Sequence, residues 1–112
     1  MKNNTLLVVT SPNIPEMTIV QTLGLVTGNA IRARHVGKDI LAGLRAIVGG
    51  EITEYAKLLA ESREQALDRM VAKAKIMDAN AIVSVRFNTS VIMGGAAEMM
   101  AYGTAVIAEK SS

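Results

Sequence analysis

The sequence predicts an α+β domain in which one long helix and one short helix pack on an antiparallel sheet. Three observations predict it: β-branched runs near both ends of the chain, helically spaced apolar residues in the middle, and glycine pairs between them. The chain has 112 residues, which suits one domain. It contains no repeats, no low-complexity tract and no linker, so we expect residues 1–112 to form a single domain.

Extended elements are expected first. Residues 5–10 form a short apolar run that indicates a strand buried on both faces. The two prolines within residues 11–15 mark a turn. Residues 18–35 are rich in Val, Ile and Thr and predict a strand or strand pair, in which Gly24 and Gly28 indicate a bulge or sharp bend.

Two helices are expected next. Residues 38–48 repeat apolar side chains at helical spacing and predict a short helix that Gly49 and Gly50 end. A second helix is expected from an N-cap at Thr53 to about Ala79. A helix of about 26 residues extends about 39 Å, roughly three times the radius of gyration of a domain of this size. It must therefore lie across a sheet.

Two more strands complete the expected sheet. In residues 81–93, Val83, Val85 and Phe87 alternate with polar residues, which is typical of a strand with one buried face. Residues 102–108 form the second strand, and the glycine pair at residues 94–95 connects the two.

Arg63 is the residue that fits its helix least well. Polar side chains of the long helix fall on one arc, and Arg63 lies near the centre of the opposite, apolar side. A buried guanidinium keeps its proton and needs acceptors. The favoured interpretation is a structural ion pair with Glu51 or Glu98. The alternative is an anion pocket at a subunit boundary, where Arg63 meets a carboxylate or phosphate ligand.

Composition excludes several classes of function. The chain has no cysteine and one histidine, which excludes disulfides, thiolate zinc sites and multi-histidine metal cages. His35 has no serine or aspartate at a spacing that suggests a catalytic triad, so we expect no enzyme. Aromatic residues make up 3% and the net charge is +2, which argues against a nucleic-acid partner. The chain contains no apolar run long enough for a membrane span, and we expect a cytoplasmic protein.

The apolar content predicts self-association. Hydrophobic residues make up 50% of the chain before its 9 glycines are counted. With glycine included, the usual share is about 45–50%. A single chain of this size has too little interior to bury so many apolar side chains, so we expect more than one subunit.

Several motifs resemble one known family. They are Gly49-Gly50-Glu51 followed by Tyr55, Arg63, Ala66 and Met70, then Ala79-Asn80-Ala81 and Val85-Arg86-Phe87, and finally Glu98 with the strand Ala101-Tyr102-Gly103-Thr104-Ala105-Val106. Together they are similar to the YbjQ-like family over almost the whole chain. The resemblance implies a bacterial or archaeal protein with a dodecin-like β-α-β arrangement that assembles into a ring, typically a homopentamer. Members carry the label "putative heavy-metal-binding" and have no established reaction.

The resemblance marks positions without assigning roles. Glu51, Tyr55, Arg63, Glu98 and Tyr102 are carried over as candidates for a ligand site or a buried ion pair. One departure is Asp78, where the family usually has glycine before Ala-Asn-Ala; aspartate tolerates a left-handed backbone better than most residues.

Metal binding and scaffolding both remain open. Glu51, Glu98 and His35 are weak metal candidates, and the methionines are more typical of core filling. A ring would bring one carboxylate from each subunit to its axis. The sequence therefore predicts a ring-forming binding protein with a metal ion or small anion between subunits, or alternatively a ligand-free structural scaffold subunit with no catalytic activity.

Overall fold

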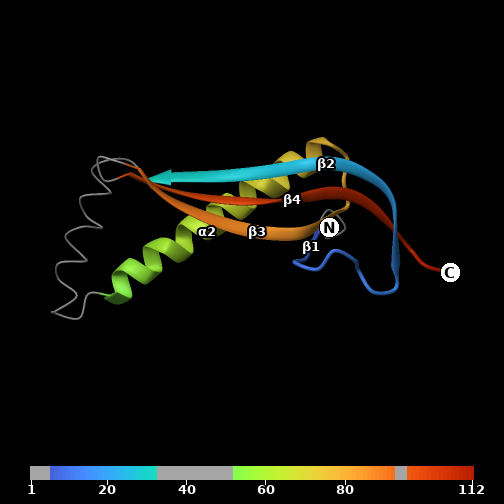
Figure 1. The fold of residues 1–112 in the computed structure, drawn as a ribbon, viewed down its shortest axis with the longest axis horizontal. Helices are drawn as coiled ribbons and strands as arrows, with labels where there is room; N and C mark the ends of the chain where they lie inside the picture. Colours follow the sequence, from blue (N-terminus) through green and yellow to red (C-terminus); the bar gives the residue numbers. More distant parts are fainter. Residues whose placement is uncertain (1–5, 33–51, 93–95) are drawn as a thin grey trace.

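A computed structural model describes residues 6–32, 52–92 and 96–112. In chain order, the elements are β1 (Leu7–Val8), β2 (Met17–Arg32), α2 (Ile52–Ile76), β3 (Ala81–Ile92) and β4 (Ala96–Lys110). The three long strands lie side by side and α2 crosses one face of the sheet obliquely (Figure 1). This arrangement confirms the α+β class. The short helix expected over residues 38–48 and the glycine connection at residues 94–95 lie outside the described residues.

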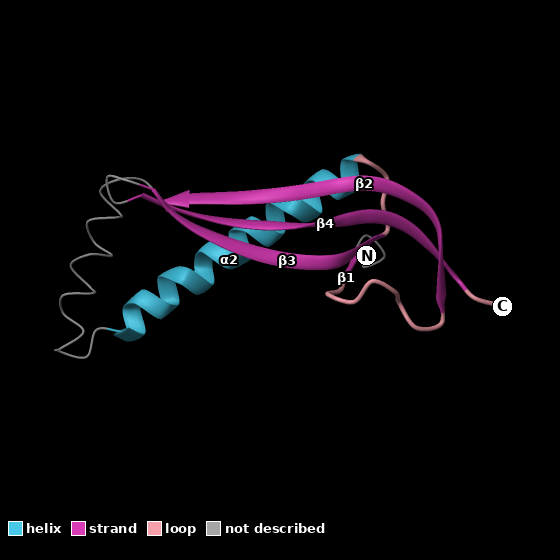
Figure 2. Cartoon of the chain, viewed as in Figure 1, coloured by secondary structure: helices cyan, strands magenta, loops and turns pink. Residues whose placement is uncertain are grey.

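The sheet is mixed, with the strand order β1-β3-β4-β2. β4 lies in the middle and is antiparallel to both β2 and β3. β1 is parallel to β3, so the expectation of a purely antiparallel sheet holds only for the three long strands. β1 is also shorter than expected and lies on the outside of the sheet, where Leu7 is exposed. The expectation of a strand buried on both faces was therefore wrong. Figure 2 shows the helix and sheet as two layers.

The two glycines of β2 have different roles. Gly24 has a φ of 126° and lies where the register with β4 shifts, so the expected bulge is present there. Gly28 lies in the regular ladder. A Cβ atom built on Gly28 would lie 2.1 Å from the carbonyl oxygen of Ala66 and 2.3 Å from the backbone nitrogen of Met70. Glycine is present at position 28 because the backbone of α2 packs directly on it.

The long helix is confirmed, with different ends. It begins at Ile52, so Thr53 lies inside the helix, and it ends at Ile76, three residues before the expected end. Asp78 has a φ of 66° and its N–H donates to the carbonyl of Lys75, while the N–H of Ala79 donates to the carbonyl of Ala74. These two bonds are those of a Schellman C-cap with Asp78 in the left-handed position. Aspartate thus takes the place of the usual glycine.

A bulge in β3 divides the buried side chains between the two faces of the sheet. Ser84 has a φ of 55°, and the register with β4 shifts between Val83 and Arg86. Val85 therefore packs in the core beneath α2, with Ala66, Met70, Ala74 and Ala101 among others. Val83 packs on the other face, where the N-terminal segment covers it with Ile14. The predicted strict alternation, which placed Val83 and Val85 on one face, fails at this bulge.

β4 is longer than the expected strand over residues 102–108. Its first residues have low intrinsic strand preference, but β2 and β3 pair with them on both sides, as in Ile31–Glu98–Ser90. Tertiary pairing therefore decides where this strand begins. Among the described residues, no helix is long and apolar enough to cross a membrane.

Candidate functional site

The face of the sheet opposite α2 carries the candidate residues Glu98 and Tyr102. Side chains alternate along a strand, and Met99 and Ala101 belong to the core beneath α2, so Glu98 and Tyr102 lie on the other face. The same argument applies to β2, where Ala30 belongs to that core and Asn29 does not. We call the surface formed by Thr27, Asn29, Asn88, Glu98, Met100 and Tyr102 the open face, because the N-terminal segment covers only the other end of the sheet.

Glu98 is held by a strand neighbour. Its carboxylate Oε2 accepts a hydrogen bond from Asn29 Nδ2 at 2.5 Å, and Glu98 is half-buried. In the register of the sheet, Glu98 lies between Ile31 of β2 and Ser90 of β3. Neither neighbour carries a positive charge. Among the described residues, Asn29 is the partner of this half-buried carboxylate, and a carboxylate has lone pairs for further donors or a cation.

Asn29 also connects Glu98 to the helix. Arg69 of α2 donates from Nη1 to the main-chain oxygen of Asn29 at 2.5 Å. This hydrogen bond fixes the backbone of β2 at Asn29, the residue whose side chain donates to Glu98. Neither Asn29 nor Arg69 was predicted from the sequence as a site residue. The available signal was an asparagine within a β-branched and apolar strand, where asparagine is disfavoured unless its amide has a partner.

Tyr102 lies on the same face of β4, four residues beyond Glu98, and is half-buried. Its cross-strand neighbours are Thr27 on β2 and Arg86 on β3. Arg86 donates from Nη1 to the carbonyls of Thr10 and Val85, each at 2.9 Å. Its guanidinium therefore ties the N-terminal segment to β3.

Arg63 does not lie where the helical periodicity placed it. The fully buried positions of α2 in the described range are Ser62, Ala66, Met70 and Ala74, and Arg63 is exposed. The helix crosses the sheet obliquely (Figure 1). Its buried positions recur every four residues, so the side that faces the sheet shifts along the helix and leaves Arg63 exposed. Arg63 and Glu98 lie on opposite sides of the sheet and form no ion pair in the described part of the chain. The expected burial of Arg63 within one subunit is corrected accordingly.

Three other candidates are not placed by the structure. Glu51 and His35 lie outside the described residues. Tyr55 lies in the first turns of α2, but its side chain is outside the described set. The predictions that these three residues contribute to an ion pair, a ligand site or a metal site are therefore untested.

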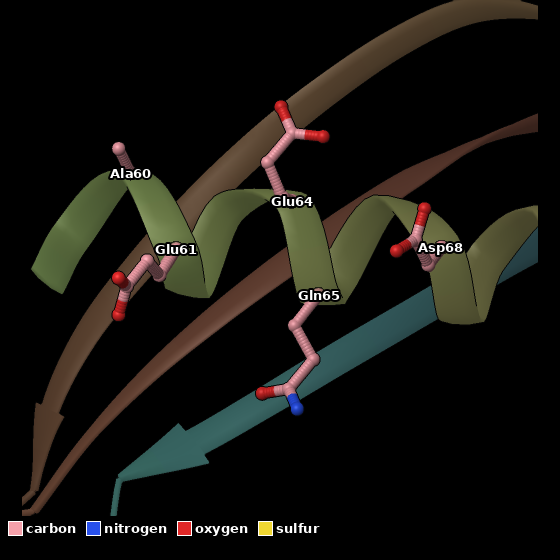
Figure 3. Close-up of a pocket in the computed structure, with 5 residues that line it drawn as sticks. All are labelled: Ala60, Glu61, Glu64, Gln65 and Asp68. Atoms are coloured by element: carbon pink, nitrogen blue, oxygen red, sulfur yellow. The ribbon is translucent and has the colours of Figure 1, made fainter. Parts of the chain in front are cut away.

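The outer face of α2 carries a shallow, acidic pocket. Ala60, Glu61, Glu64, Gln65 and Asp68 line it. The carboxylates of Glu61 and Glu64 point to different sides of the helix (Figure 3). Within the described residues, no three His, Cys, Asp or Glu side chains come close enough to hold a metal ion. This surface is the solvated arc of the helix that the sequence predicts.

The donors on the open face suit some metal ions better than others. Glu98 and Asn29 offer oxygen ligands, which hard cations such as Mg²⁺, Ca²⁺ and Mn²⁺ prefer. Soft heavy metals prefer sulfur, but the chain has no cysteine. Met99 is buried on the helix side of the sheet, where its sulfur accepts a hydrogen bond from Thr89 Oγ1 at 3.3 Å. Met100 offers one thioether on the open face. Within the described residues of one subunit, a single thioether and no cysteine do not make a site for a thiophilic metal, and the open face supplies one carboxylate to a hard ion.

Comparison with known proteins gives matches over most of the chain. The YbjQ family model, described as "Putative heavy-metal-binding", matches residues 6–109. A UPF0145 protein of Dehalococcoides mccartyi is 64% identical over 91 residues, which cover 81% of this chain and 88% of that protein. A UPF0145 protein of Methanosarcina acetivorans is 54% identical over 101 residues, covering 90% and 95%.

One solved structure supports the fold. It is a protein of unknown function of the DUF74 family from Pediococcus pentosaceus, with a TM-score of 0.58 and 18% sequence identity. The match covers 93% of this chain and 98% of that one. At this identity, the likeness establishes the shared fold of the two chains.

Proposed function

Because the chain belongs to the YbjQ family of "Putative heavy-metal-binding" proteins, we propose that it is a subunit of a homo-oligomeric ring that holds a small ion between subunits. The observation that carries the proposal is the half-buried carboxylate of Glu98. It has a hydrogen-bond donor in Asn29 and no cation beside it among the described residues. A second observation supports association: large apolar side chains such as Leu25 and Ile31 are exposed on the single chain.

A cation is the ion that this site favours. A carboxylate that is partly withdrawn from water gains most from a positive partner. The described residues of one subunit offer a single such ligand, and a ring repeats it around the axis. Several carboxylates at one axis repel one another unless a cation binds between them, and oxygen ligands select a hard divalent ion. By family resemblance, the ring is a pentamer.

Native mass spectrometry of untagged protein measures both the number of subunits in the oligomer and any ion bound to it. We expect one closed oligomer, and calorimetric titration with Mn²⁺ should show fewer than one ion bound per chain. Glu98→Gln should preserve the oligomer and lose Mn²⁺ binding, because the amide keeps the shape and removes the charge. Glu109→Gln is the matched control, since Glu109 lies on the same strand and is exposed; it should bind Mn²⁺ normally. Mn²⁺ binding that survives in Glu98→Gln would overturn the proposed site.

Two alternatives have distinct outcomes in the same experiment. An oligomer that binds neither Mn²⁺ nor phosphate would be a ligand-free scaffold. Phosphate binding that is lost in Arg63→Met and kept in Glu98→Gln would indicate an anion site instead. The exposure of Arg63 in the single chain leaves its guanidinium accessible to such an anion.

A further inference from the structure

Both outer sides of the sheet have unpaired backbone. The N-terminal segment pairs with β3 only as far as the bulge, where Ser84 N–H donates to Ser11 and Val85 N–H donates to Val9. In the described part of the chain, residues 86–92 of β3 therefore have a strand neighbour only on the β4 side. β2 likewise pairs with β4 alone along its whole length. Unpaired N–H and C=O groups on an exposed edge are a template for another strand.

Four of the six large apolar side chains that are exposed in the described part of the chain lie along these two edges. On β2, Val20, Leu25 and Ile31 are 51%, 71% and 60% exposed, and on β3, Phe87 is 41% exposed. Proline and lysine, which hinder edge pairing, are absent from these described edge segments, whereas β2 has register shifts up to Gly24 and β3 carries Arg86. The two edges therefore have the properties of an interface.

One contact limits which part of β2 is available. Arg69 Nη1 donates to the carbonyl of Asn29, so this position of the edge already has a partner. The stretch before it, residues 20–27, contains Val20 and Leu25 and has no such contact. The available edge of β2 is thus about as long as the available edge of β3.

We propose that residues 20–27 of β2 pair with residues 86–92 of β3 in a second copy of the chain. The inference rests on the proposed ring and specifies its interface. β2 and β3 are both antiparallel to β4 and so run in the same direction. A rotation about an axis that runs along the strands keeps that direction, so β2 pairs with the neighbour's β3 in parallel. Each copy uses two different edges, which is the head-to-tail contact that closes a ring.

The pairing also determines on which side of the sheet the carboxylates lie. A continuous sheet keeps all open faces on the same side, because every subunit is added in the same orientation. The Asn29–Glu98 pair of each copy then repeats on that side. The strand pairing therefore repeats one half-buried carboxylate per subunit on one side of the sheet.

Cysteine crosslinking tests the pairing cleanly, because the native chain has no cysteine. Leu25 and Asn88 are exposed and project from the same face of the sheet. A chain carrying both Leu25→Cys and Asn88→Cys, treated with a short bismaleimide, should give a ladder of linked subunits up to the full ring. Each single variant should remain unlinked. A linked dimer from Leu25→Cys alone would indicate β2 pairing with β2 about a twofold axis and would overturn the proposal.

A second variant tests whether the β2 edge is needed for association of the subunits. Leu25→Lys should weaken association about tenfold or more, since a charge replaces a buried leucine at each contact. Ile76→Lys is the control, because Ile76 is 82% exposed at the end of α2, away from both edges. A ring that forms without Leu25–Asn88 crosslinks overturns the edge pairing and leaves the ion site standing. A monomer at micromolar concentration overturns both.

Discussion

The side-chain amide of Asn80 pairs with both backbone groups of Ala108. Asn80 Nδ2 donates to the Ala108 carbonyl at 2.9 Å, and the Ala108 N–H donates to Asn80 Oδ1 at 2.8 Å. The Asn80 backbone N–H also donates to Val106. The amide thus acts as one more peptide unit, which extends the β3–β4 ladder before β3 begins. This geometry gives a physical role to the Ala-Asn-Ala motif that follows the helix.

Asn80→Ala should lower the free energy of unfolding by about 1–3 kcal/mol, because it leaves two partly buried backbone groups of Ala108 unpaired. Urea unfolding at a fixed protein concentration measures it. Asn88→Ala, in the exposed part of β3, should change stability by less than about 0.5 kcal/mol. Equal losses in the two variants would show that the amide pairing contributes little.

Gly28→Ala should cost about 3 kcal/mol or more, since the new methyl group meets backbone atoms of Ala66 and Met70 that no rotamer change can move. Gly24→Ala faces no neighbouring atom, and its cost is the strain of a positive φ, about 1–2 kcal/mol. Thermal unfolding of the two variants should therefore rank Gly28→Ala as the less stable. The reverse order would contradict the close contact of α2 with β2.

Asp78→Gly should raise the free energy of unfolding by about 0.5–1 kcal/mol, because glycine adopts the left-handed C-cap without steric cost. Asp68→Gly is the control inside α2 and should be destabilising by a few tenths of a kcal/mol. Chemical denaturation distinguishes the two. A destabilised Asp78→Gly would mean that the aspartate side chain makes a contribution larger than the backbone strain.

Arg63→Ala should change the stability of the isolated subunit by less than about 0.5 kcal/mol, since the side chain is exposed. Denaturation over a range of protein concentrations measures this, because only a side chain buried by a neighbour would cost stability in proportion to assembly. A loss above about 1.5 kcal/mol at every concentration would show that Arg63 is buried within one subunit.

The sequence predicted the positions of the long helix and the strands better than it predicted which of their side chains are buried. Apolar periodicity located β2, α2 and β3 to within a few residues, because burial of a continuous stripe dominates each of them. The bulge at Ser84 was missed, since nothing in the sequence separates a serine with positive φ from one in a regular strand. Arg63 was misplaced because an ideal helical wheel ignores the angle at which the helix crosses the sheet.

The candidate site was only partly predictable. Glu98 was selected as a possible ion-pair partner of Arg63 and Tyr102 by family resemblance, and both lie on the open face. Asn29 is distant in sequence, and only the register of β2 against β4 brings it to Glu98. From the sequence, Arg69 is an ordinary surface arginine of the helix. Only the structure shows that it donates to the backbone of β2 at Asn29.

The pairing of β2 with β4 has a consequence for how the protein is made. Met17 lies opposite Lys110, and Thr18 and Ser111 share a hydrogen bond across 93 residues of sequence. During synthesis, β2 emerges well before β4, the strand that separates it from β3, and stays unpaired until β4 has been made. Such distant contacts slow folding and leave apolar strands uncovered in the meantime, so nascent chains of this protein should be prone to aggregation before β4 pairs.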